Sequence, residues 1–348
     1  MSDKKDYIFS YKKSGVDISL GNRVVKKIKP LAKKTFDKNV LGNIGGFGGI
    51  YNINKNEYKK PLLISATDGV GTKLLIAKKL SNFKTIGIDL VAMSVNDIIV
   101  QGAKPLFFLD YIAVEKVEEE KIIDIIKSII KGCKESNCSL IGGEIAELPG
   151  IYSKSNFDLA GFCVGIIEKD KLLPKKNIKP GDIIYGLPSN GIHSNGFSLI
   201  RKIMYEKKYS YSKKILNKKS LDSLLLRPTK IYVKPVLSIL AHCKVKGLAH
   251  ITGGGLEENI KRILPSGLGV EINLNELDIY SNKSIFGWLH NECNLNKKEM
   301  LKTFNCGIGM SLITNKKEKD NLLSFCEEIK QPIKILGQIN DKNFFSFI

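Results

Sequence analysis

Residues 62–73 read LLISATDGVGTK, and this stretch decides how the rest of the chain is interpreted. The apolar run after Pro61 predicts a buried strand. The run ends in Asp68, two glycines, a hydroxyl and Lys73, which are groups that suit a bound metal and a phosphate. Glycine lets the backbone approach an anion closely, and clustered N–H groups can cradle it. A hairpin turn with a solvated Asp and Lys is the alternative. The convergence of complementary groups favours a metal–phosphate site.

This stretch is neither a Walker loop nor a dinucleotide fingerprint. A Walker loop needs Gly-x-x-x-x-Gly-Lys-Ser/Thr, whereas the order here is Gly71-Thr72-Lys73, with no glycine at the required distance before it.

Composition indicates a globular protein of two domains. The length of 348 residues favours two domains, and 43% apolar residues are enough for real cores. Residues 1–13 show no signal peptide, and no run approaches the ~20 apolar residues that a membrane helix needs. Seven cysteines without a Cys-x-x-Cys pair predict reduced thiols in a cytoplasmic protein, with neither a disulfide framework nor a zinc site.

The net charge of +20 raises the question of a polyanionic partner. A nucleic-acid binder is expected to use more arginine and to interleave aromatic residues with its basic patch. Only four arginines occur, and the lysines are dispersed over the whole length. Compositional bias is the better explanation, with a field that favours phosphorylated small molecules, so we expect no nucleic-acid and no membrane partner.

Two features before the 62–73 stretch could reach an anion. A helix predicted over residues 21–34 carries Lys29, although a solvated arm is an equal alternative. Residues 42–49 read GNIGGFGG, and five glycines in eight residues make a loop able to close over a phosphate chain. Such a loop is weak evidence alone and gains weight beside the 62–73 stretch.

Carboxylates recur at the ends of apolar segments in the first half. Residues 86–101 read as a short strand running into a helix, with Asp89 as a metal candidate or an ordinary N-cap. If Asp89 and Asp97 shared one helix they would be about 12 Å apart, so at most one joins Asp68 at an ion. Asp97, inside an apolar helix, is the better candidate. Glu144 follows another strand and two glycines, so acids at one sheet edge would meet at a metal.

The second half begins after a charged stretch, residues 169–181, that contains two prolines. We therefore predict domains at 1–168 and 169–348. A strand over 182–187, a polar loop over 189–196 and a helix start predict an anion site, in which His193 is about equally a structural donor or a catalyst. A strand over 247–252 then enters a triple-glycine turn and a helix, a second possible anion site. Glu257 and Glu258 in its first turn are also a plain dipole-capping arrangement.

Together these segments resemble the phosphoribosylformylglycinamidine cyclo-ligase family, also called AIR synthetases, of purine biosynthesis. The resemblance extends from Tyr11-x-x-x-Gly15-Val16-Asp17 to Thr303–Gly307 and is specific only as a set. Two departures stand out, since Ile145 replaces a common Thr and Ile192 a usual Pro. The motifs that carry the resemblance are TDGVGTK at 67–73, VNDI at 95–98, QGAKP at 101–105, GGE at 142–144, HSNGFSL at 193–199 and HITGGG at 250–255.

The resemblance implies an α/β (α+β) fold of two domains. The N-terminal domain would form a β-barrel with its twin in a homodimer, as the few helices available to cover its strands also suggest. The C-terminal domain would be an α/β sandwich.

The resemblance also implies ATP as co-substrate with Mg²⁺, and it assigns site residues. Lys73 and His193 are the catalytic candidates. The metal candidates are Asp68, Asp97 and Glu144. The ATP-binding candidates are Lys29, Gly45, Gly46, Gly48, Gly49, Asp68, Gly69, Gly71, Thr72, Lys73, Asn96 and Asp97. The substrate-binding candidates are His193, Ser194, Asn195, His250, Thr252, Gly253, Gly254 and Gly255.

The implied activity is the cyclisation of formylglycinamidine ribonucleotide to 5-aminoimidazole ribonucleotide. ATP would phosphorylate the formyl oxygen, the amidine nitrogen would attack, and phosphate would leave. Mg²⁺ and Lys73 would offset the developing charge, and His193 would assist proton transfer. A kinase of the same superfamily is one rival. Selenophosphate synthetase would be expected to have a reactive Cys near the N-terminus, and none precedes Cys133. A non-catalytic nucleic-acid-binding protein is the other rival.

Overall fold

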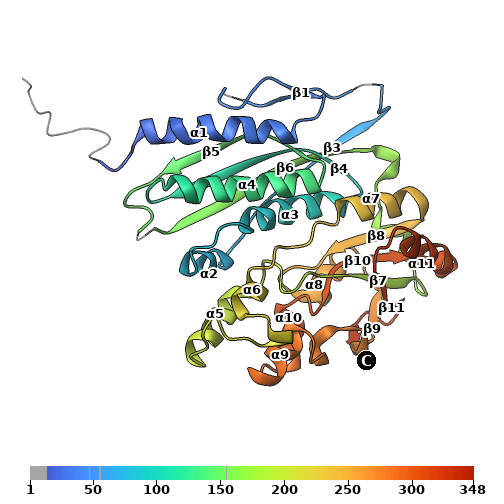
Figure 1. Ribbon diagram of the computed structural model, residues 1–348. Helices are drawn as coiled ribbons and strands as arrows, with labels where there is room; N and C mark the ends of the chain where they lie inside the picture. Colours follow the sequence, from blue (N-terminus) through green and yellow to red (C-terminus); the bar gives the residue numbers. More distant parts are fainter. Residues whose placement is uncertain (1–13, 47, 55, 154) are drawn as a thin grey trace, which may run out of the picture.

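The computed structural model describes residues 14–46, 48–54, 56–153 and 155–348, and it folds them around two separate larger sheets (Figure 1). The expected mixture of helices and strands is therefore confirmed. Tyr11 and Phe47, which belong to sequence motifs quoted above, lie outside the described residues. The domain boundary between residues 168 and 169 stays a prediction.

The first half is a four-stranded sheet with helices on one side. Its strands lie in the order β3-β6-β4-β5, antiparallel except for the β4–β5 pair. A two-stranded ladder of β1 and β2 precedes it. The elements are α1 (Ile18–Ala32), β1 (Val40–Leu41), β2 (Ile50–Tyr51), β3 (Pro61–Gly69), α2 (Lys73–Lys79), α3 (Ile86–Ile99), β4 (Lys104–Val114), α4 (Glu119–Glu135), β5 (Ser139–Glu147) and β6 (Phe157–Glu168).

Helix α3 covers one face of this sheet and is itself covered by α4 (Figure 1). The prediction of a short strand at the start of residues 86–101 was wrong, because the whole of 86–99 is helical. Thirteen of its fourteen residues are buried, so the apolar run shows no helical period that sequence reasoning could detect. Helix α4 is amphipathic, as its apolar spacing predicts.

Among the described residues, no helix covers the opposite face of the sheet, which presents large apolar side chains to solvent. Leu63 on β3, Tyr111 on β4 and Phe162 on β6 are 59%, 41% and 39% exposed. The strands form no closed barrel among the described residues of this one chain. The dimeric barrel therefore stays a prediction, and this uncovered apolar face is what motivates it.

The second half is a six-stranded sheet in the order β12-β9-β11-β7-β10-β8. Pro235 lies in the first turn of α7, where a missing N–H costs no helical hydrogen bond. The elements are β7 (Ile183–Pro188), α5 (Phe197–Glu206), α6 (Leu221–Leu225), α7 (Val233–His242), β8 (Val245–His250), α8 (Gly255–Lys261), β9 (Gly269–Ile272), α9 (Ile285–Glu292), α10 (Lys297–Thr303), β10 (Ile308–Thr314), α11 (Lys319–Glu328), β11 (Lys334–Asn340) and β12 (Phe345–Phe347).

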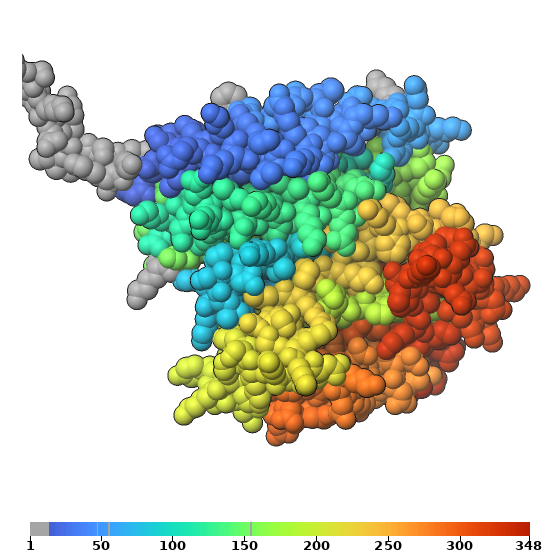
Figure 2. All heavy atoms as spheres, in the orientation of Figure 1, coloured from blue at the N-terminus to red at the C-terminus, as the bar shows by residue number. Residues whose placement is uncertain are grey.

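The two halves pack directly against each other, and Figure 2 shows the segment of α5 and α6 lying against α2. The hydroxyl oxygens of Thr72 and Ser198 lie 3.0 Å apart across this junction. Asn96 on α3 donates a hydrogen bond to the carbonyl of Lys230 at 2.9 Å. None of the helices in the described part of the chain is long and apolar enough to cross a membrane.

Candidate active site

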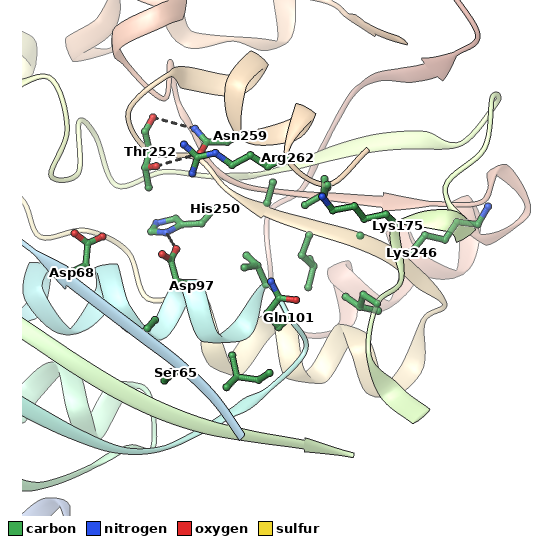
Figure 3. A pocket seen from close by; sticks show the side chains of 18 of the residues that line it. Ser65, Asp68, Asp97, Gln101, Lys175, Lys246, His250, Thr252, Asn259 and Arg262 are labelled. Atoms are coloured by element: carbon green, nitrogen blue, oxygen red, sulfur yellow. Dashed lines mark hydrogen bonds and ion pairs between the residues drawn. The ribbon is translucent and has the colours of Figure 1, made fainter. Parts of the chain in front are cut away.

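A cavity of about 590 Å³ lies between the two halves, and most of its walls come from four elements (Figure 3). Strand β3 and helix α3 contribute from the first half, and β8 and α8 with its following residues contribute from the second. The polar residues of its lining are Ser65, Thr67, Asp68, Asp97, Gln101, Lys175, Lys246, His250, Thr252, Asn259 and Arg262.

Asp68 stands at the end of β3 on the face of the sheet that α3 covers. Its partner on the neighbouring strand β6 is Gly161. A Cβ added to Gly161 would contact the ring of Phe108 and the side chain of Leu90 on α3, so both residues of the pair point toward the face that α3 covers. Burial raises the pKa of the Asp68 carboxyl, the Gly69 N–H at 2.7 Å opposes this, and the nearby Asp97 raises the pKa further. Two carboxylates thus share the cavity wall, as the sequence predicted for this pair.

His250 ties the second carboxylate to the other half of the molecule. Its Nδ1 lies 2.9 Å from Oδ1 of Asp97, and its Nε2 lies 3.4 Å from Nδ2 of Asn96. A carboxylate only accepts and an amide nitrogen only donates, so the neutral ring with its proton on Nδ1 satisfies both contacts. His250 therefore orients Asp97 in the cavity (Figure 3).

Asp68 and Asp97 suit a divalent cation such as Mg²⁺, whereas Glu144 does not join them within one chain. Oxygen ligands from one or two carboxylates plus substrate phosphates are the usual Mg²⁺ set. Glu144 pairs with Tyr111 and so lies on the uncovered face. Its strand, β5, is three strand spacings from β3, roughly 14 Å. No group of three or more His, Cys, Asp or Glu with metal-site geometry occurs among the described residues.

Basic side chains line the same cavity, and sequence reasoning missed them. Lys175, Lys246 and Arg262 come from three separate segments of the second half (Figure 3). Lys246 is held by Asp182, with Nζ at 2.7 and 2.8 Å from its two oxygens. Lys175 and Arg262 make no ion pair with a described acidic side chain, which leaves two cations for an anionic ligand. No local motif marks them, because only folding brings them beside β3.

The triple-glycine turn is fastened by a side chain from the helix that follows it. Asn259 Nδ2 donates to the carbonyls of Thr252, Gly253 and Gly255, at 3.5, 3.2 and 2.8 Å. Gly254 and Gly255 have φ of +90° and +63°, a region that side-chain-bearing residues avoid. The turn thereby sets Thr252 in the cavity wall, as Figure 3 shows, next to His250.

Known proteins resemble this chain over almost its whole length. A model of AIR synthase related proteins matches with its N-terminal domain at residues 50–167 and with its C-terminal domain at 179–348. Proteins named phosphoribosylformylglycinamidine cyclo-ligase from Neisseria meningitidis serogroup C and Alkaliphilus metalliredigens are each 46% identical to the chain. The matches cover 96% of this chain and of the first protein, and 95% of this chain and of the second. The chain belongs to the phosphoribosylformylglycinamidine cyclo-ligase family.

Solved structures share this fold at low identity. Thiamine-monophosphate kinase from Stenotrophomonas maltophilia K279a matches with a TM-score of 0.66 and 16% identity, over 95% of this chain and 96% of that one. The hydrogenase maturation protein HypE in complex with ATP matches with a TM-score of 0.63 and 14% identity, over 94% and 88%. The family models that match both domains confirm the expectation of a two-domain AIR-synthetase-like fold.

In this member of the cyclo-ligase family, Lys73 lies in a buried polar network and does not line the cavity. Its side chain is fully buried, with Nζ 2.8 Å from Oδ2 of Asp89 and 2.6 Å from the carbonyl of Arg227. Asp89 Oδ1 also accepts from Ser194 Oγ and from Thr229 N and Oγ1. Asp89 is not the N-cap of α3, because Thr85 holds that position and Asp89 lies in the first turn of the helix. The network joins the halves, and its geometry gives Lys73 no direct path to a phosphate.

His193 is likewise buried, and its ring acts as an acceptor. Nε2 receives the N–H of Asn190 at 3.0 Å and that of Lys230 at 3.4 Å. Burial first, and then the neighbouring His250 and Lys73, hold the pKa of His193 well below its usual value. A neutral, enclosed imidazole fits the structural alternative better than proton transfer to a ligand. Asn195, by contrast, reaches the glycine turn, where a Cβ on Gly253 would lie 3.4 Å from its Oδ1.

The remaining nucleotide candidates of this family member divide between the two edges of the first sheet. Gly69, Gly71 and Thr72 continue from Asp68 at the β3 edge. Asn96 packs under the cavity, where Tyr232 N donates to its Oδ1. The glycine loop and Lys29 belong to the other edge: a Cβ on Gly45 would meet Lys29 Cε at 2.7 Å, and one on Gly49 would meet Ile141 of β5. Gly46 and Gly48 have open space.

Proposed function

We propose that this chain cyclises formylglycinamidine ribonucleotide to 5-aminoimidazole ribonucleotide with ATP, releasing ADP and phosphate in purine biosynthesis. The observation that carries the proposal is near-full-length identity of 46% to proteins named as this cyclo-ligase. The cavity supports this function, because its two carboxylates and its unpaired basic side chains suit a nucleoside triphosphate and a phosphorylated substrate. The HypE structure bound to ATP adds that this fold accommodates a nucleotide.

The chain's own groups have separable roles in this reaction. Asp68 and Asp97 would hold Mg²⁺, which when bound would offset negative charge on the transferred phosphoryl group. Arg262 and Lys175 would bind ligand phosphate, with His250 keeping Asp97 in place. Lys73 and His193 act from beneath the cavity as positioning residues, in place of the direct catalytic roles inferred from sequence. Thr252 and Asn195 face the substrate side.

Turnover dependent on the ribotide is the direct test of this function. ATP hydrolysis by the purified chain is measured with and without formylglycinamidine ribonucleotide. We expect ADP release to require the ribotide and to match the aminoimidazole ribonucleotide formed, one for one. A kinase would instead phosphorylate another acceptor, and ATP turnover indifferent to the ribotide would contradict the proposal.

The fate of the formyl oxygen tests the mechanism. Ring closure requires this oxygen to leave, and hydroxide leaves badly at neutral pH. Transfer of the γ-phosphoryl group to the oxygen makes phosphate the leaving group once the amidine nitrogen has attacked the carbon. A substrate with heavy oxygen in its formyl group should yield labelled phosphate, one label per turnover. Label in water with unlabelled phosphate would exclude this route.

A homodimer would reunite the two parts of the nucleotide site. Strands β3 and β5 are the edges of the first sheet and run in the same direction. A two-fold axis along the strands would therefore place β5 beside β3 of a second copy and close a barrel over the apolar faces. This arrangement brings the glycine loop and Lys29 toward Asp68 of the other copy, whereas Glu144, on the uncovered face, would lie in the barrel interior. We propose that the active unit is this dimer.

Sedimentation velocity at micromolar concentration tests the dimer. We expect the wild-type chain to sediment as a dimer, and Phe162→Asp to shift it to monomer because a charge replaces an apolar side chain in the buried barrel interior. Tyr205→Asp is the matched control, since Tyr205 is 85% exposed on α5, away from this face. A wild-type chain that sediments only as monomer would refute the arrangement.

A further inference from the structure

A second cavity, of about 230 Å³, lies wholly in the second half of the chain, and α6 and α9 contribute to its lining. It shares no lining residue with the cavity that holds Asp68 and Asp97. None of the roles described above uses it. Its polar lining residues are Ser189, Asn190, Asn217, Lys219, Arg227, Asp278, Lys283 and Ser284.

The charge around this cavity is predominantly positive. Lys219, Arg227 and Lys283 come from three different segments, and none makes an ion pair with an acidic side chain among the described residues. The one lining carboxylate, Asp278, has its Oδ1 3.3 Å from Nζ of Lys334 and is partly neutralised by it. The cavity thus gathers three uncompensated cations, which favours an anion over a cation or an apolar ligand.

Residues that carry backbone and hydroxyl donors line the same space. Ser284 caps α9 by accepting the N–H of Gly287 on its Oγ. The N–H groups of Ile285 and Phe286, in the first turn, have no acceptor within the helix, and both residues line the cavity. Independently, the Oγ of Ser189 is buried and has no hydrogen-bond partner among the described residues. A buried hydroxyl without a partner costs free energy unless a ligand or water satisfies it.

We propose that this cavity is a second anion site that binds a phosphate group, either inorganic phosphate or the phosphate of a small phosphomonoester. Its volume is well under half that of the first cavity, so it suits a phosphate with little attached. Arg227 provides the fork geometry that phosphate oxygens accept, and α9 provides oriented N–H groups.

The site touches segments that support the first cavity. The carbonyl of Arg227 accepts from Lys73 at 2.6 Å, and the N–H of Asn190 binds His193. A phosphate held by these two segments binds the folded state only, so it raises the free energy of unfolding by mass action.

Binding of inorganic phosphate to the full chain is measured by calorimetry, without ATP or ribotide, so the outcome does not depend on the proposed reaction. Arg227→Gln and Lys283→Gln are each expected to weaken binding by about 10-fold or more, because a charge-assisted contact is worth about 1.5–3 kcal/mol. Lys218→Gln is the matched control, since Lys218 neighbours Lys219 without lining the cavity. It should bind as the wild type does.

Two further arms make the result decisive. Arg262→Gln, in the first cavity, should leave this site intact, and loss of all phosphate binding in that variant alone would overturn the proposal. Lys283 is exposed, so Lys283→Gln keeps the test valid if Arg227→Gln fails to fold. Ribose 5-phosphate is then titrated in competition with phosphate. Displacement identifies a phosphomonoester site, and absence of displacement identifies a site for free phosphate. Wild-type binding in both Arg227→Gln and Lys283→Gln would refute the site.

Discussion

Asp68→Asn is expected to lower ribotide-dependent ATP turnover by at least about 100-fold while the fold remains intact. Even outer-shell partners of a metal site cost roughly 10–100-fold when removed, and Asp68 is proposed as a direct ligand. Burial and the nearby Asp97 both disfavour the charged form of the Asp68 carboxylate and raise its pKa. A neutral amide at this position should therefore not destabilise the folded chain. Turnover is measured at ordinary Mg²⁺ concentration, and folding by thermal denaturation.

Asp158→Asn is the matched control for this variant. Asp158 accepts the N–H of the next residue, Leu159, at 2.8 Å, just as Asp68 accepts that of Gly69 at 2.7 Å. It is exposed in the single chain and does not line the cavity. Because it shares the face of β6 that carries Phe162, the sedimentation of this variant is measured together with its activity. We expect wild-type activity in the control. Wild-type-like turnover in Asp68→Asn would remove Asp68 from the metal site.

Lys73→Met is expected to lower the free energy of unfolding by about 3–5 kcal/mol, as measured by urea denaturation. Removing one partner of a buried ion pair leaves the other charge uncompensated, which is the costly case. Asp89→Asn should cost a comparable amount, and the double variant should cost less than the sum of the two. Such non-additive costs would show that Lys73 acts as a positioning residue through Asp89. If Lys73 instead contacted phosphate directly, its substitution would alter ATP affinity and leave the free energy of unfolding unchanged.

An exposed ion pair supplies the control for the buried one. Lys261 and Glu257 interact one turn apart on α8, with both side chains about half exposed. Lys261→Met should change the free energy of unfolding by no more than about 0.5 kcal/mol, because water already solvates both charges. If Lys73→Met were as mild as Lys261→Met, the buried network would not be what holds the two halves together.

Local apolar patterns in the sequence predicted secondary structure correctly where a single strand or helix produces the pattern. The apolar run before Asp68 forms β3, and the spacing in residues 119–135 forms an amphipathic helix. Helix α3 was misjudged at its start, because burial on all sides removes the period that distinguishes a helix from a strand. The motif set, quoted in order, sufficed to identify the family that the comparisons then showed.

The sequence by itself determined that Asp68 and Asp97 are chemically suited to one ion, and that glycines shape the turn after His250. Only the tertiary structure decided which candidates meet. Sheet order separates Glu144 and the glycine loop from Asp68, while domain packing brings Lys175 and Arg262 to it. The same packing encloses Lys73 and His193. The physical reason is that chemistry belongs to single side chains, whereas proximity and burial depend on contacts between residues far apart in the chain.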